Sequence, residues 1–370
     1  MNAPAPPSHA GRPGGLLDVP AIVWLRKNLF SNWISTAATL LIGYFVLKFV
    51  IGFLAWGVFG AVWSLDGQSS NVCREMRGSG ACWALIGENY RFILFGTYPF
   101  QEQWRPALVV LLFISLYVVS ALRRFWNSRL IIIWVVGLTA IGVLMWGGIL
   151  GLQYVEQERW GGLPITLILA TFGIVIAFPV GILLALGRRS HMPAIKAICV
   201  AYIELIRGVP LITLLFMASV MFPLFLPEGL TIDKLLRAQV AIIMFAAAYQ
   251  AEVIRGGLQS ISKGQYEAAD ALGLGYWQKT GFIILPQALR IVIPPMVNSL
   301  IAMFKDTSLV VIIGLYDLMN AAKASFVDPA WRGASMEAYV FVGLIYFVFC
   351  FFMSKYSQGL ESRLAAAQKR

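Results

Sequence analysis

Lys305 and Asp306 stand side by side within an otherwise apolar stretch of the chain, from Ile291 to Tyr316. An ionisable side chain inside a membrane is costly, so residues of this kind are candidates for contact with a transported solute. Together they offer both signs of charge. The alternative is that they pair with neighbouring helices and only hold a bundle together.

A short charged pattern, Glu-x-Ile-Arg-Gly, occurs twice in the chain. It places Glu204 three residues before Arg207 and Glu252 three residues before Arg255, so each pair shares one face of a helix. Both pairs fall where apolar segments end. Two interpretations follow: an ion pair at the membrane surface, or a contact to a gate or a substrate. Glu204 and Glu252 therefore join Lys305 and Asp306 as candidates for a substrate path.

Other kinds of chemistry find little support in the sequence. No His or Cys pair has the spacing of a metal site, and the apolar segments almost lack the His residues or paired carboxylates of a membrane-embedded enzyme. A phosphate-binding loop needs a Gly-rich turn followed by Lys and a hydroxyl residue. The nearest match, Gly273 to Thr280, lacks the Gly-Lys step. We therefore expect no catalytic residue, metal or cofactor in this chain.

The composition indicates which elements must position these charges. Of 370 residues, 59% are hydrophobic and 13% are charged, and the mean hydropathy is +0.75, as in membrane proteins. The net charge is +11, but the Lys and Arg residues occur in small groups between apolar runs. They form no basic stripe of the kind that binds nucleic acid.

Eight segments are long and apolar enough to cross a bilayer core of about 30 Å as helices. They are Ser35 to Trp63, Pro106 to Leu122, Leu130 to Leu150, Leu163 to Gly187, Gly208 to Pro227, Ala238 to Ala251, Ile291 to Tyr316 and Ala338 to Ser354. The start of the chain lacks the features of a cleaved signal, so the first segment is expected to remain as an anchor.

The loops between these segments differ in their content of Lys and Arg. One set of alternate loops, with both chain ends, holds 18 of the 29 Lys and Arg residues, and the other set holds nine. Since these residues cross membranes poorly during insertion, the richer side and both termini are predicted to be cytoplasmic. The loop from Ser64 to Arg105 then faces an oxidising compartment in a bacterial inner-membrane protein, where Cys73 and Cys82 can form a disulfide.

The stretch from Arg255 to Arg290 is too long and too patterned for a simple connection. Ser262 and Gln265 have the spacing of a capping box, and Tyr266 to Leu272 favours a helix that Gly273 can end. We call this stretch the 255–290 loop. It is predicted to lie in the cytoplasm.

The 255–290 loop carries a fixed pattern of acidic, small and apolar residues. Its members are Glu267, Ala268, Ala269, Gly273, Ile283, Leu285 and Pro286. Their spacing resembles, at every position, the EAA loop of the permease subunits of binding-protein-dependent ABC importers. Small residues let a groove of another protein approach the helix backbone, and an acidic residue near the helix start suits a basic partner. The resemblance implies that these residues dock on a cytoplasmic ATPase.

A second short helix is predicted in the same loop, from Tyr276 until Pro286 interrupts it. The alternative for the whole loop is an amphipathic helix that lies among the lipid headgroups. Such a helix needs neither Gly273 nor the Leu-Pro step at a fixed distance.

The resemblance extends beyond the loop. Segments 202–211, 287–295 and 305–309 look like the polar amino-acid subgroup of these permeases, and the similarity covers roughly 161–358. The first 160 residues depart from the short members of the family. Long members with such an extension resemble the permease subunits of the general L-amino-acid uptake system.

The resemblance implies an all-α membrane protein with about eight transmembrane helices. A type I ABC importer permease core would follow an N-terminal extension of three spans. The predicted parts are a cytoplasmic tail (1–34), the extension with its outer loop (35–160), the five-span core (161–358) with the cytoplasmic docking loop (255–290), and a cytoplasmic tail (359–370).

The implied function is that of a permease subunit that moves amino acids across the inner membrane by alternating access. ATP and Mg would be bound by a separate cytoplasmic ATPase dimer. The other implied partners are a second permease subunit, a periplasmic amino-acid-binding protein and membrane lipid, without nucleic acid. The alternatives are a different small polar solute, or an ion-coupled secondary transporter, whose inverted repeats the sequence does not show.

Overall fold

The computed structural model describes residues 20–65, 71–75, 78–229 and 231–368. In these ranges the chain is all-α, as predicted, apart from a two-residue strand, β1 (Tyr316–Asp317), which bridges to Gly161 and Gly162. The helices are α1 (Pro20–Asn28), α2 (Trp33–Leu54), α3 (Asn71–Glu75), α4 (Ala84–Phe95), α5 (Trp104–Ala121), α6 (Ser128–Trp146), α7 (Gly162–Arg188), α8 (Pro193–Gly208), α9 (Leu211–Phe216), α10 (Lys234–Ser260), α11 (Lys263–Ala271), α12 (Tyr276–Gln278), α13 (Leu285–Asp306), α14 (Leu318–Val327) and α15 (Ser335–Gln368).

Seven helical segments of the described chain are long and apolar enough to cross a membrane, and a bent pair of helices makes an eighth candidate. The seven are Trp33–Phe59, Phe100–Ala121, Ser128–Trp146, Gly162–Arg188, Lys234–Ser260, Tyr276–Ile313 and Ser335–Ser362. The prediction of about eight spans is therefore confirmed in number. Three of the segments lie within the predicted extension.

The eighth span differs from the expected straight helix over Gly208 to Pro227. Helix α8 and the helical segment Leu211–Phe225 meet at an angle of 103°. Pro210 lies at the bend and has no backbone N–H to continue the ladder of α8. The second limb has only 15 residues, about 22 Å at 1.5 Å per residue, which is shorter than the bilayer core.

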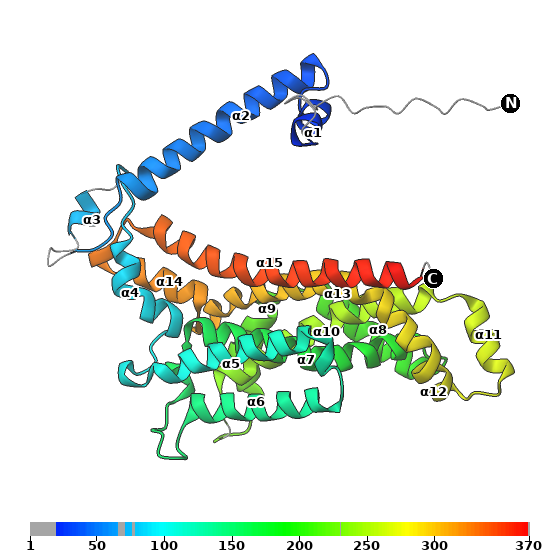
Figure 1. Cartoon of the computed structure of the whole chain (residues 1–370). Coiled ribbons are helices and arrows are strands. Elements are labelled where there is room, and N and C mark those ends of the chain that lie inside the picture. The colour runs from blue at the N-terminus through cyan, green and yellow to red at the C-terminus, as the bar shows by residue number, and fades with distance from the viewer. Residues whose placement is uncertain (1–19, 66–70, 76–77, 230, 369–370) are drawn as a thin grey trace, which may run out of the picture.

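The extension is attached to the core mainly through α4 and α5. Tyr117 on α5 shares a hydrogen bond of 2.5 Å with Thr171 on α7. The guanidinium of Arg105 is fully buried, and its Nε and Nη1 donate to the carbonyls of Leu144 and Gln153 at 2.6 and 2.9 Å, which ties α5 to the end of α6. Helix α2 differs, because none of its apolar span is buried and it lies apart from the bundle (Figure 1).

The centre of the core is the pair α7 and α10, which pack along their length through small residues. A Cβ at Gly181 of α7 would lie 3.0 Å from Cβ of Gln250 on α10. A Cβ at Gly257 of α10 would lie 2.9 Å from the carbonyl oxygen of Ala288 on α13. Glycine at these positions lets the backbones approach closely, as is common in membrane helices.

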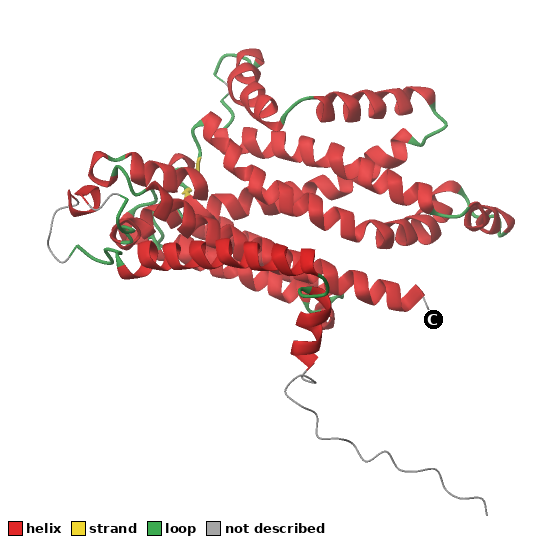
Figure 2. Cartoon of the chain, turned by 90° about the horizontal axis from the view of Figure 1, so that it is seen from above, coloured by secondary structure: helices red, strands yellow, loops and turns green. Residues whose placement is uncertain are grey.

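The helices of the 255–290 loop, α11 and α12, project from one end of the bundle (Figures 1 and 2). The last described turn of α15 lies at the same end. The loop that joins α2 to α4 lies at the opposite end. We call these the loop end and the disulfide end.

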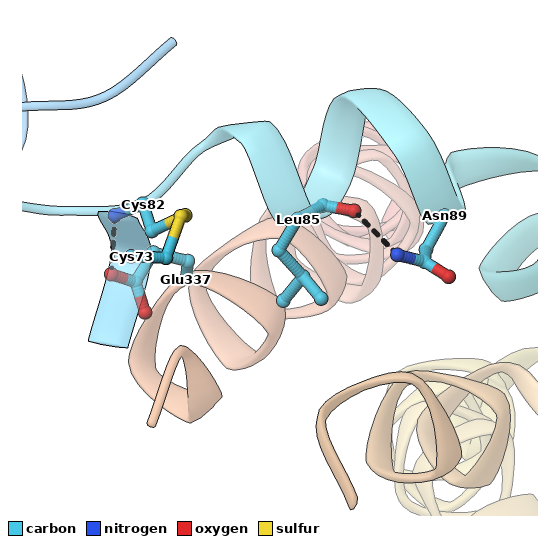
Figure 3. Close-up of a disulfide and its surroundings, with 5 residues drawn as sticks. All are labelled: Cys73, Cys82, Leu85, Asn89 and Glu337. Carbon is cyan, nitrogen blue, oxygen red and sulfur yellow. Dashed lines mark hydrogen bonds between the residues drawn. A yellow bond between two sulfur atoms is a disulfide. The ribbon is translucent and has the colours of Figure 1, made fainter. Parts of the chain in front are cut away.

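The structure joins Cys73 and Cys82 by a disulfide, with their Cα atoms 5.5 Å apart (Figure 3). The backbone N–H of Cys82 donates to the carboxylate of Glu337, in the first turn of α15, at 2.7 Å. This contact connects the extension to the last helix of the core. The other two cysteines, Cys199 and Cys350, are free.

Counting reactive thiols in the denatured chain tests the disulfide. Of the four cysteines, we expect two to react with a maleimide without reductant and all four after reduction. The protein is purified from membranes without reductant, and the adducts on each chain are counted by mass spectrometry. The Cys73→Ser variant should give three adducts in both conditions. Four adducts on the unreduced native chain would show that the bond is absent.

Candidate functional site

Helix α11 presents only part of the predicted docking motif to solvent. Glu267, Ala268 and Gly273 are exposed, whereas Ala269 is fully buried against the rest of the loop end. Burial of one small side chain thus fixes which face of α11 points outward. Large apolar side chains surround the exposed members of the motif, since Leu272, Trp277 and Phe282 are 76%, 72% and 78% exposed. This combination of an acidic residue and apolar side chains suits a protein partner.

Three hydrogen bonds hold α11 in place. Tyr266 donates from its hydroxyl to the carbonyl of Leu258 on α10 at 3.2 Å and accepts from Arg189 at 3.3 Å. Gln287 on α13 donates to the side-chain oxygen of Gln265 at 2.9 Å. The helix is therefore connected to three elements of the core and is not a loose appendage.

Gly273 ends α11 as predicted. Its φ is +71°, a left-handed conformation that most residues adopt poorly, and its N–H donates to the carbonyl of Asp270 at 2.9 Å. The side chain of Asp270 also forms an ion pair with Lys279, which closes the turn between α11 and the next helix. The turn is thus defined by one glycine and one ion pair.

Two local predictions for the loop were wrong. The side chain of Ser262 caps no N–H of α11, and Gln265 bonds to Gln287 instead. Pro286 does not end a helix, because the segment Tyr276–Ile313 is continuously helical over 38 residues. A π-helical turn over Lys279–Ile284 changes the hydrogen-bond register just before the proline, which accommodates its ring and its missing N–H.

The remaining motif residues lie on this continuous helix. Ile283 and Leu285 are half-buried and pack against the apolar cluster at the loop end, while Pro286 is exposed. A helix of 38 residues is about 57 Å long, roughly twice the thickness of a bilayer core. The loop-end part of this helix therefore extends beyond the membrane.

Five charged side chains meet at the loop end, and we call them the Glu252 cluster. Arg255 donates to Glu252 from Nη2 at 2.8 Å and from Nε at 3.1 Å. Arg188 lies 2.9 Å from Glu252 and 2.8 Å from Glu204, and Arg207 lies 3.6 Å from Glu252. Glu252 is mostly buried, with 15% of its side chain exposed, whereas Glu204 is 57% exposed. The cluster joins α7, α8 and α10.

The Glu252 cluster corrects part of the predicted pairing. Glu252 and Arg255 pair within one helix as expected. Glu204 and Arg207 instead pair across helices, with Arg188 and Glu252. Of the two interpretations that the sequence left open, this geometry favours ion pairing that holds helix ends together.

Lys305 and Asp306 form no ion pair within the described part of the chain. Lys305 lies on an exposed stripe of α13 together with Ile291, Pro295, Asn298 and Ala302, spaced alternately by four and three residues along one helix face. Asp306 is half-buried. An ammonium and an amide are too polar to face hydrocarbon, so this stripe must adjoin protein or water.

Comparison with known proteins identifies the chain. Residues 177–365 match the family described as the binding-protein-dependent transport system inner membrane component. The chain belongs to this family. It is 49% identical over 362 residues to the inner membrane amino-acid ABC transporter permease protein YhdY of Escherichia coli (strain K12), and the match covers 96% of each chain.

The further relatives fall into two groups, those that match nearly the whole chain and shorter ones that match about half of it. The glutamate/glutamine/aspartate/asparagine transport system permease protein BztC of Rhodobacter capsulatus is 39% identical, with 96% of each chain covered. The glutamate/aspartate import permease protein GltK of Escherichia coli is 37% identical over 209 residues, which are 55% of this permease and 92% of GltK. A solved chain of an amino acid ABC transporter with histidines is 33% identical over 55% of this chain and 92% of its own, with a TM-score of 0.49.

This permease is a multi-pass inner-membrane protein and a translocation subunit, not an enzyme, and ATP hydrolysis belongs to a separate chain.

The sequence did not reveal the role of Arg188, which bridges both acidic residues of the Glu252 cluster. The signal that could have found it is its position at the end of an apolar span. Its partners lie 16 and 64 residues away, beyond the reach of a local pattern.

Proposed function

We propose that this permease moves amino acids across the inner membrane by alternating access, driven by a cytoplasmic ATPase that docks on the 255–290 loop. One observation carries the proposal. The second half of the docking motif, Ile283, Leu285 and Pro286, lies on a helix that continues without a break into the span whose face carries Asn298 and Lys305. Movement imposed on the loop by an ATPase would therefore act directly on a polar face within the membrane. ATP and Mg would be bound by the ATPase.

We propose amino acids as the solutes on two grounds, the names of the similar permeases and the charges of Lys305 and Asp306. YhdY and BztC are named as permeases for amino acids and cover nearly the whole chain. Lys305 and Asp306 can contribute both signs of charge along a path for a zwitterion. A different small polar solute is the second candidate.

The exposed stripe on α13 supports a second permease subunit as a partner, either a paralogue or another copy. Its members repeat at alternating intervals of four and three residues, which suits packing against another helix. Lys305 would then adjoin the subunit interface and not lipid. The family description also implies a periplasmic binding protein, which would deliver amino acids at the disulfide end. In this arrangement the loop end and both termini are cytoplasmic.

Transport by the reconstituted complex tests this function. The permease is assembled with its ATPase and binding protein in liposomes, and uptake of labelled amino acids is measured. We expect accumulation with ATP and Mg and none with an ion gradient alone. Accumulation driven by an ion gradient without ATP would identify a secondary transporter instead.

A further inference from the structure

A cavity of about 180 Å³ lies beside the disulfide, where the extension meets the core. We call it the Glu337 cavity. Its walls come from the end of the first span, the disulfide loop and the turn that enters α15. The lining residues include Trp56, Cys73, Cys82 and Glu337, and the others are mainly glycine and alanine. Most of them are small, which leaves the space between these segments unfilled.

Glu337 brings an unsatisfied carboxylate to this cavity. It is only 4% exposed, and its Oε1 accepts from the backbone N–H of Cys82 at 2.7 Å (Figure 3). Its Oε2 is buried, and the described ranges of the chain provide it with neither a hydrogen-bond partner nor an ion pair. A buried carboxylate oxygen without a hydrogen-bond donor is unfavourable because its lost hydration is not replaced. The cavity therefore calls for a donor that the described part of the chain does not supply.

The position of the cavity indicates where that donor comes from. Trp56 lies in the last turns of the span Trp33–Phe59, and Glu337 lies in the first turn of the span Ser335–Ser362. Trp56, Trp83 and Trp63 form a row with ring centroids 6.4 and 6.1 Å apart. Tryptophans gathered at the ends of spans are typical of the headgroup level of a bilayer. The Glu337 cavity thus lies at the level where lipid headgroups and small solutes in water both occur.

The chemistry of the lining selects the class of ligand. One carboxylate and an indole wall suit a monovalent cation with N–H donors, because the ammonium binds the carboxylate oxygen and contacts the aromatic face. A divalent metal is a poor fit, since no group of three His, Cys, Asp or Glu residues gathers anywhere in the described chain. A quaternary ammonium has no N–H to donate to Oε2.

We propose that the Glu337 cavity binds a primary ammonium group, supplied either by an ethanolamine phospholipid or by a free amine from the aqueous phase. The disulfide positions the site. It holds Cys82 so that its N–H occupies one oxygen of Glu337 and leaves the other for the ligand. This binding site is separate from the docking loop and independent of the transport function proposed above.

Lipid retention by the whole chain tests the proposal. The permease is placed in nanodiscs that contain equal amounts of phosphatidylethanolamine and phosphatidylcholine with identical acyl chains, and bound lipid is measured by native mass spectrometry. We expect native protein to retain the ethanolamine lipid roughly tenfold over the choline lipid, because one charge-assisted hydrogen bond is lost with choline. Glu337→Gln should reduce this preference to near unity. Glu75→Gln, which changes an exposed carboxylate on α3, is the matched control and should keep it.

A second arm separates the two sources of ammonium. In nanodiscs of phosphatidylglycerol only, binding of labelled ethanolamine is compared between the native chain and Glu337→Gln. Binding that needs Glu337, without lipid preference in the first arm, assigns the site to a free amine. If Glu337→Gln does not fold, Trp56→Leu serves instead and should lower the preference severalfold. Equal lipid retention and equal amine binding by native and variant proteins would overturn the proposal and leave the cavity to water.

Discussion

Replacing Gly273 with aspartate is expected to lower ATP-driven uptake by about tenfold or more, which corresponds to about 1.4 kcal/mol of docking energy. Membrane insertion should be unchanged, because a Cβ at Gly273 meets no atom within 4 Å and aspartate adopts left-handed conformations more readily than most residues. The new charge instead enters the exposed surface of the 255–290 loop that is proposed to contact the ATPase. Uptake in liposomes and co-purification of the ATPase are the measurements.

Gly151→Asp is the matched control for this variant. Gly151 also has a positive φ, +75°, and open space around its Cβ, but it lies in the extension. Uptake by the Gly151→Asp variant should stay within about twofold of the native level, because most substitutions at exposed positions have small effects. Glu267→Arg should behave like Gly273→Asp. Native uptake by Gly273→Asp would count directly against the docking role of the loop.

Removing the carboxylate of Glu252 is expected to be the most destabilising single change within the Glu252 cluster. Glu252→Ala leaves Arg188, Arg207 and Arg255 without their shared partner, and for a mostly buried carboxylate the loss is about 3 kcal/mol. Thermal unfolding of the purified permease in detergent should then shift down by several degrees. Ends of α7, α8 and α10 would separate first, because these are the helices that the cluster joins.

Glu204→Ala supplies the comparison within the same cluster. Glu204 is 57% exposed and, among the described residues, forms an ion pair with Arg188 alone, so its loss should cost less than about 1 kcal/mol. A double variant should show little more than the effect of Glu252→Ala alone. Equal shifts for the two single variants would mean that Glu252 does not organise the cluster.

The features that the sequence predicted best are those encoded within a few turns of chain. Long apolar runs placed the spans, and Gly273 placed the end of α11, because each is a local property of composition or backbone. The motif also predicted a helix at α11, and the structure has one. The separate ATPase followed from the missing phosphate loop and agrees with the family.

The features that the sequence could not predict depend on contacts between residues that lie far apart along the chain. Ser262 has the right spacing for a cap, but Gln265 finds a partner on α13 and the capping box does not form. Pro286 is a helix breaker by type, but the preceding π-helical turn accommodates it. Glu204 lies three residues from Arg207 and pairs with Arg188 across the helix boundary. Burial of Ala269 and exposure of Ala268 likewise depend on packing that spacing alone does not reveal.

The continuous helix from Tyr276 to Ile313 has the proportions of an unequal lever. Pro294 and Pro295 lie within it, about 27 Å from Tyr276 and about 15 Å from Lys305 at 1.5 Å per residue. If the rod turns about the paired prolines, Lys305 moves in the opposite sense to Tyr276 and by roughly half as far. A displacement of the Tyr276 end by a few ångströms would therefore move Lys305 by about half as much, a shift comparable to the length of one hydrogen bond.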